Sequence, residues 1–139
     1  MNTPTWVLLA FAAWTLLILL GTVGVYRWSM ILTGRATVRE WQPGTPQGSA
    51  WYQRAMNAHR NCIENLPVYA AIVLVLNASG LTSSTVDMLA LVLITARVLQ
   101  SLVHICFEQT EAVAILRFVF FFIQIVMMFW MGLYIVLGV

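Results

Sequence analysis

Residues 5–26 read TWVLLAFAAWTLLILLGTVGVY and contain no charged side chain. A helix rises about 1.5 Å per residue and the hydrocarbon core of a bilayer is ~30 Å thick, so this stretch is long enough to cross a membrane once. Trp6 and Trp28 stand at its two ends, where amphipathic rings prefer the headgroup level. Residues 1–4 lack the basic residues of a signal peptide, and we therefore expect a retained membrane helix.

The rest of the chain contains three further apolar segments. Of all residues, 61% are hydrophobic and only 9% are charged. Segments of this length and composition leave almost no chain for a soluble domain. We predict an all-α fold, a single integral membrane domain over residues 1–139 in which four helices form a bundle. The helices are expected at about residues 5–34, 51–78, 84–107 and 111–138.

The connection between the first two helices sets the predicted orientation. Residues 35–50 are expected to form a loop because they are interrupted by Pro43, Gly44, Pro46 and Gly48. Five arginines and one glutamate lie between residues 27 and 60, whereas residues 77–87 contain no cation. Basic loops stay in the cytoplasm. We therefore predict a multi-pass protein, of the inner or plasma membrane if bacterial, with cytoplasmic loops at 35–50 and 107–111 and both termini on the opposite side.

Three arginines, Arg60, Arg97 and Arg117, lie inside separate apolar segments. Ionisable groups at membrane depth are costly, and their default interpretation is a functional site. Counted from the cytoplasmic ends of the predicted helices, all three lie ~9 to 15 Å deep. The sequence therefore predicts a polar site in the cytoplasmic half of the membrane.

Polar residues around these arginines form two stripes at similar depth. The second helix contributes Asn57, Arg60, Asn61 and Glu64. The third helix contributes Arg97, Gln100, Ser101 and His104. Residues three or four apart lie on the same face of a helix, so the polar residues of each stripe form one continuous polar surface. We expect the two stripes to face each other.

Each of these features also has a purely structural interpretation. Arg60 and Glu64 are one turn apart and could form an ion pair that holds helices together. Arg117 is close to a helix start and could simply extend to the cytoplasmic surface. Asn57 and Gln100 are as well suited to hydrogen bonds between helices as to ligand contacts.

Several other chemistries are disfavoured. Cys62 and Cys106 form no CxxC motif and lack zinc-site spacing with His59 and His104, so no metal is predicted. The net charge of +2 comes from arginines concentrated near one face, which suits an anionic substrate or membrane lipids better than nucleic acid. Proton-coupled transport would need a free carboxylate within the membrane, whereas Glu64 follows Arg60 by one turn.

The segment RAMNAHRNCIENLP, residues 54–67, strongly resembles the MAPEG family, the membrane-associated proteins in eicosanoid and glutathione metabolism. ARVLQS at residues 96–101 and ILR at residues 115–117 support the resemblance. It therefore touches three of the four predicted helices and agrees with the chain length. The resemblance implies a homotrimer of four-helix protomers, with glutathione held between neighbouring subunits in the cytoplasmic half of the membrane.

The resemblance also implies roles for individual residues. Asn61 and Glu64 would contact glutathione, with Glu64 suited to its ammonium group. Arg60 and Arg97 would hold its carboxylates, with help from Arg54. The remaining predicted glutathione contacts are Asn57, Gln100, Ser101 and His104.

Arg117 is the predicted catalytic residue, because the family uses an arginine near the start of the fourth helix to activate the thiol. Arginine is a poor proton acceptor, so its role would be to stabilise the thiolate by charge. The thiolate would then attack a lipophilic electrophile or hydroperoxide that arrives laterally from the bilayer. The resemblance thus implies a glutathione transferase or peroxidase with glutathione as co-substrate.

Two positions depart from the family pattern. Asn57 stands where the eicosanoid enzymes carry arginine, and His104 stands where they carry tyrosine. These departures fit a prokaryotic or divergent member with broad transferase or peroxidase activity better than a dedicated leukotriene or prostaglandin synthase. The alternative functions are a noncatalytic trimeric membrane regulator or binding protein and, with less support, a small proton-coupled transporter.

Overall fold

The computed structural model describes residues 1–40 and 49–138, and in these ranges the chain is all-helical. Its elements are α1 (Thr3–Ile18), the π-helical η1 (Leu19–Gly24), α2 (Val25–Leu32), the short 3-10 helix η2 (Val38–Glu40), α3 (Ala50–Ser79), α4 (Ser84–Cys106) and α5 (Glu111–Leu137). Where one helix was expected over 5–34, a π-helical stretch separates α1 from α2. The prolines and glycines of the predicted 35–50 loop lie outside the described residues.

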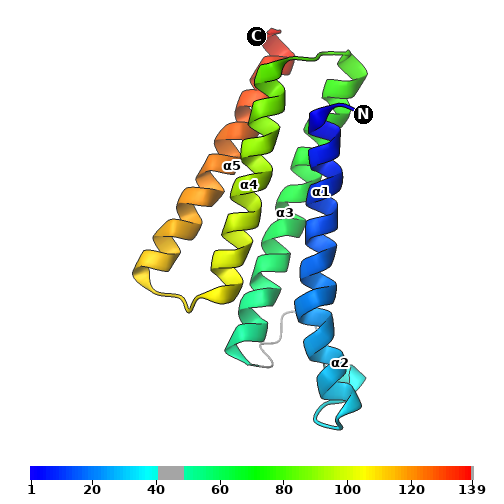
Figure 1. Ribbon diagram of the computed structural model, residues 1–139, viewed down its shortest axis with the longest axis vertical. Coiled ribbons are helices and arrows are strands. Elements are labelled where there is room, and N and C mark those ends of the chain that lie inside the picture. The colour runs from blue at the N-terminus through cyan, green and yellow to red at the C-terminus, as the bar shows by residue number, and fades with distance from the viewer. Residues whose placement is uncertain (41–48, 139) are drawn as a thin grey trace.

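Within residues 1–40 and 49–138, four helical spans are long and apolar enough to cross a membrane. They are Thr3–Leu32, Ala50–Ser79, Ser84–Cys106 and Glu111–Leu137. Figure 1 shows them running side by side, with both termini at the end of the bundle that holds the α3–α4 connection and the α4–α5 connection at the other end. The all-helical, multi-pass membrane architecture is confirmed, and the side on which the termini lie stays a prediction.

Side-chain caps define where these helices begin. The oxygens of Asn2, Ser49, Ser83 and Thr110 accept hydrogen bonds from backbone N–H groups in the first turns of α1, α3, α4 and α5. Such caps satisfy donors that have no partner within the helix. At the other end, α3 stops at Gly80 with φ of 69°, a left-handed conformation that glycine adopts without strain.

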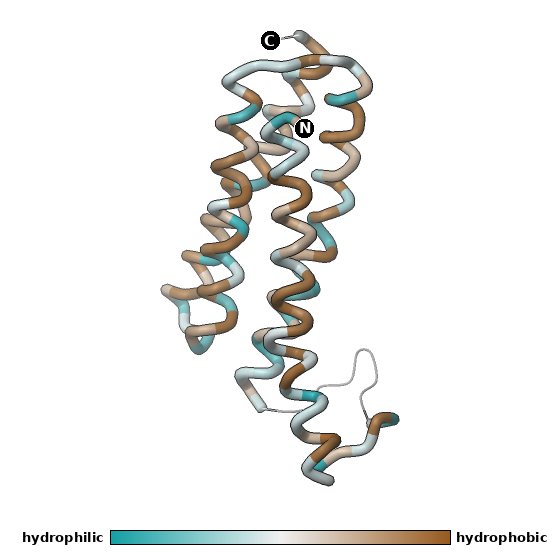
Figure 2. Tube along the Cα trace, turned by 45° about the vertical axis from the view of Figure 1, so that its right-hand side comes forward, coloured by the Kyte–Doolittle hydropathy of each residue, from teal (hydrophilic) through white to brown (hydrophobic). Residues whose placement is uncertain are grey.

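The core lies between α1, α3 and α4. Phe11 stacks on Tyr69 with ring centroids 6.1 Å apart, and the Tyr69 hydroxyl donates to the Pro4 carbonyl at 2.8 Å. Large apolar side chains also cover the outside, where Phe129 is 71% exposed. Figure 2 shows apolar residues along the whole length of the spans. An outer surface of this kind suits lipid or protein neighbours rather than water.

Candidate functional site

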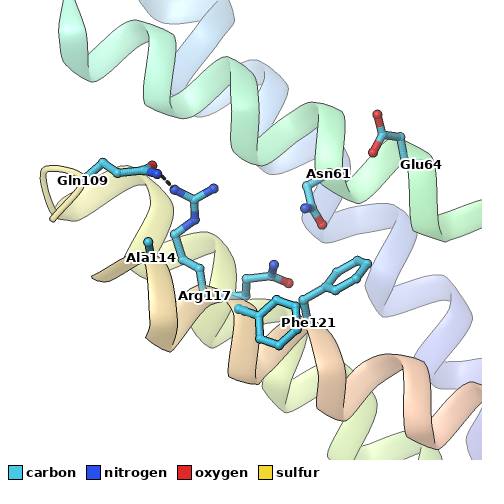
Figure 3. A pocket seen from close by; sticks show the side chains of 8 residues that line it. Asn61, Glu64, Gln109, Ala114, Arg117 and Phe121 are labelled. Atoms are coloured by element: carbon cyan, nitrogen blue, oxygen red, sulfur yellow. Dashed lines mark hydrogen bonds between the residues drawn. The ribbon is translucent and has the colours of Figure 1, made fainter. Parts of the chain in front are cut away.

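A polar groove of about 350 Å³ lies between α3, α4 and α5, near the α4–α5 connection. It is lined by Asn61 and Glu64 of α3, Gln100 of α4, Gln109 of the connection, and Ala114, Arg117, Phe118 and Phe121 of α5. Figure 3 shows Asn61 and Glu64 across the groove from Arg117 and Phe121, with Gln109 at one end. Of the described residues in this lining, Arg117 is the single cation and Glu64 the single carboxylate.

Arg117 is held in the second turn of α5, after the helix start that Thr110 caps. One terminal guanidinium nitrogen, Nη1, donates to the Gln109 side-chain oxygen. The Nε atom is buried and has no hydrogen-bond partner among the described residues. Arg117 therefore has a donor that no described residue uses, and its fixed positive charge lies at the groove.

Arg97 is buried behind the groove, with 1% of its surface exposed. Its Nη1 donates to Asn61 Oδ1 at 2.6 Å and lies 3.7 Å from Cys62 Sγ. Its guanidinium carbon lies 5.4 Å from the centroid of the Phe11 ring, within the range of cation–π attraction. The bond to Asn61 joins α4 to α3, so the two predicted polar stripes meet at Asn61, whereas the other members of the α3 stripe are exposed.

Gln124 completes this buried network and was not predicted as a site residue. Arg97 Nε donates to Gln124 Oε1 at 2.7 Å, and Gln124 Nε2 donates to Gln100 Oε1 at 2.8 Å. The sequence does contain a signal for it, because residues 118–137 of α5 hold no other amide and no charge. A lone polar residue in such a run is expected to face the bundle interior and find a partner.

Three predicted contacts lie inside the bundle or at its edge rather than in the groove. The Ser101 hydroxyl donates to the Arg97 carbonyl at 3.0 Å and lies 3.6 Å from Cys62 Sγ. His104 is buried, and its Nε2 has no partner among the described residues. Arg54 Nε donates to the Ile105 carbonyl at 3.2 Å. Arg54 and Ser101 thus connect α3 with α4 in the protomer.

Asn57 and Arg60 lie on an exposed face of α3 and do not line the groove. Glu64 is exposed as well, and the described residues include no ion pair between Arg60 and Glu64. The structural interpretation of these two charges as a helix-locking pair thus has no support within one protomer. Of the predicted site residues, the structure brings Asn61, Glu64, Gln100 and Arg117 together in one groove.

The described part of the chain contains no group of three or more His, Cys, Asp or Glu side chains placed to hold a metal ion. Cys62 and Cys106 are both free thiols, the first buried and the second exposed. Among the described residues, the groove presents one guanidinium, one carboxylate and three amides.

Comparison with known proteins gives one match. The family model described as the MAPEG family matches residues 4–137. No curated protein and no solved structure matches the chain. The matched range contains every residue of the groove and nearly the whole of each membrane span.

Proposed function

Since this chain belongs to the MAPEG family, we propose that it is a glutathione-dependent membrane transferase or peroxidase whose site is the groove beside Arg117. Family membership fits a glutathione-related function at a membrane in general terms. The observation that carries the narrower proposal is the position of Arg117. Among the residues that the structure describes, it is the one cation lining a groove that also holds a carboxylate and three amides.

Glutathione has groups that match this lining. Its ammonium group would pair with Glu64, and its backbone carbonyls or carboxylates would accept hydrogen bonds from the amides of Asn61 and Gln100. Asn57 and Arg60 are exposed on α3, so in the proposed homotrimer they would reach glutathione at a boundary between subunits. Arg54, Arg97, Ser101 and His104, which the family resemblance names as contacts, would then support the site from inside the protomer.

The chemical role of Arg117 follows from its fixed charge. A guanidinium does not accept a proton, but it favours the thiolate of glutathione over the thiol, and the thiolate is the nucleophile. In transfer, the sulfur forms a bond to an electrophilic carbon and the leaving group departs with its electron pair. In peroxide reduction, two glutathione molecules are oxidised to their disulfide while a hydroperoxide becomes an alcohol and water.

The second substrate would enter from the bilayer. Phe118 lines the groove and is 64% exposed, and its ring stacks on Phe122 with centroids 6.3 Å apart. This aromatic surface of α5 connects the groove with the outside of the bundle. A lipophilic electrophile or lipid hydroperoxide dissolved in the membrane would therefore reach the thiolate without crossing water.

The test is titration of glutathione into the detergent-purified protein by calorimetry, followed by addition of a chromogenic aryl halide or a lipid hydroperoxide. Saturable binding with turnover is the expected result. Binding without turnover would instead favour a noncatalytic regulator. Absence of binding would contradict the proposal, since the arginines would then serve another ligand or the fold alone.

Arg117→Ala gives the sharper prediction. We expect a loss in turnover of about 100-fold, the typical effect of removing one preorganised donor from a developing or existing anion. The ultraviolet absorbance of bound glutathione thiolate should disappear while glutathione still binds. Arg35→Ala is the matched control, because Arg35 is an exposed arginine outside the groove. An unchanged thiolate signal in Arg117→Ala would remove Arg117 from the mechanism.

A further inference from the structure

Asn61 and Gln100 are two amides that line the groove. Their side-chain oxygens accept hydrogen bonds from one buried network, formed by Arg97 and Gln124. The network starts at Arg97, and an arginine side chain contains only donors. Whatever bonds to it must therefore present an acceptor. This condition determines which end of each neighbouring amide faces inward.

Asn61 is oriented directly. Its Oδ1 accepts from Arg97 Nη1 at 2.6 Å and from Asn65 Nδ2 at 3.1 Å. Turning the Asn61 amide over would place its NH₂ group against two donors, one of them charged. None of the described residues accepts a hydrogen bond from Asn61 Nδ2, which belongs to a side chain that lines the groove. The two protons of that nitrogen are left for a ligand.

Gln100 is oriented through Gln124. Arg97 Nε donates to Gln124 Oε1, so the other end of that amide, Nε2, must donate. Its two protons are used by the Phe120 carbonyl at 3.0 Å and by Gln100 Oε1 at 2.8 Å. Gln124 is 1% exposed, and both of its NH₂ protons are used. Because Gln100 Oε1 accepts from Gln124, the other end of the Gln100 amide, Nε2, is left to donate to a ligand in the groove.

We infer that Arg97 and Gln124 are positioning residues that hold the NH₂ groups of Asn61 and Gln100 toward the groove, making its wall selective for an anionic, acceptor-only group beside Arg117. The inference rests on the proposed function and specifies the polarity of its binding site. A thiolate or a carboxylate is such a group. A ligand that offers an N–H or O–H donor to this wall would meet two further donors and a cation, and it would be rejected.

Gln124→Glu tests the chain of hydrogen bonds from Arg97 through Gln124 to Gln100, and it keeps the acceptor that Arg97 needs. The new carboxylate accepts from Arg97 Nε but cannot donate to Gln100, so Gln100 should turn over and present its oxygen to the groove. We expect the Kd of glutathione to rise about 10-fold, the effect of losing one hydrogen bond to a charged group. Thermal unfolding of the variant in detergent checks that the bundle is intact.

The new negative charge could also act through space, and a double-mutant cycle with Gln100→Ala separates the two effects. If Gln124 acts through the Gln100 amide, Gln124→Glu should change the Kd less than 2-fold once that amide is gone. An equal change in both backgrounds, or no change in either, would overturn the inference.

Side-chain amide exchange measured by NMR provides a readout that needs no ligand. The NH₂ protons of Gln124 should be protected from exchange, whereas those of Asn61 and Gln100 should exchange freely. In Gln124→Glu, the Gln100 protons should become protected as that amide turns over. If the wild-type protein shows this pattern but binds no glutathione, the proposed function is refuted, whereas the donor wall formed by the NH₂ groups of Asn61 and Gln100 is retained. Protection of Asn61 and Gln100 in the wild type would refute the donor wall itself.

Discussion

Arg97 is a buried cation whose acceptors are neutral. It is 1% exposed, and it bonds to the amide oxygens of Asn61 and Gln124 rather than to any carboxylate among the described residues. Taking a charge out of water without an ionic partner costs several kcal/mol even after relaxation. A chain that needed only stability would place an apolar side chain here, so the position of this cation argues for a role at the adjacent groove.

The cost of burying the Arg97 charge predicts the effect of removing it. Replacing the buried cation and its amide partner together, as Arg97→Met with Gln124→Leu, should stabilise the protein by about 1–3 kcal/mol, in the range seen when buried ionic networks become apolar. Asn61 Oδ1 keeps its bond from Asn65 Nδ2 in this variant. Thermal unfolding in detergent measures the stability, and glutathione titration should show weaker binding. A lowered unfolding midpoint would mean that the network holds the fold.

The first membrane span contains a π-helix of six residues, Leu19–Gly24, between α1 and α2. The hydrogen bonds of a π-helix join residues five apart instead of four, and π-helical turns often occur near functional regions. The two glycines of this stretch differ in their surroundings: a Cβ added at Gly24 would lie 3.0 Å from the Leu19 carbonyl oxygen, whereas one at Gly21 would meet no heavy atom within 4 Å. A side chain is therefore harder to accommodate at Gly24 than at Gly21.

The two glycines provide a matched pair of variants. Gly24→Ala should destabilise the protein by about 1 kcal/mol, because the π-helical turn must shift to relieve the contact. Gly21→Ala should be neutral or stabilising by up to about 1 kcal/mol, since alanine is the better helix former and has free space there. Thermal unfolding midpoints compare them directly. Equal midpoints for both variants would show that Gly24 has no special packing role.

At the scale of the whole molecule, the bundle has two distinct ends. The groove and the α4–α5 connection lie at one end, and both termini lie at the other. The predicted orientation places the groove in the cytoplasmic half of the membrane, where glutathione is available to a membrane enzyme. The apolar outer surface of α5, with Phe129 at 71% exposure, is left for lipid or for neighbouring subunits of the proposed trimer.

Cysteine labelling tests the orientation of the intact protein in its membrane. Cys106 is exposed at the groove end of α4, whereas Cys62 is buried. A membrane-impermeant maleimide should therefore label Cys106 only from the cytoplasmic side. Ser79→Cys, at the exposed end of α3, should be labelled only from the opposite side when Cys106 is replaced by serine. The reverse pattern would invert the predicted topology.

Much of the fold was accessible from local features of the sequence. Apolar length and the scarcity of charge predicted the four spans, because hydropathy over about 20 residues is a property of the segment and not of its partners. The motif at residues 54–67 identified the family, since it depends on residue order alone. The π-helical stretch had no comparable signal, because its backbone geometry depends on packing around Gly24.

The sequence by itself thus determined the membrane architecture and the family, and the depth of the polar groups in the membrane stays a prediction. Only the tertiary structure decided which of these groups meet: it joined Gln124 of α5 to Arg97 of α4, buried Arg97 behind the groove, and left Asn57 and Arg60 outside it. The physical reason is that the rotation of each helix about its axis is set by packing against the others. Helical periodicity shows which residues share a face, but not which neighbour that face will touch.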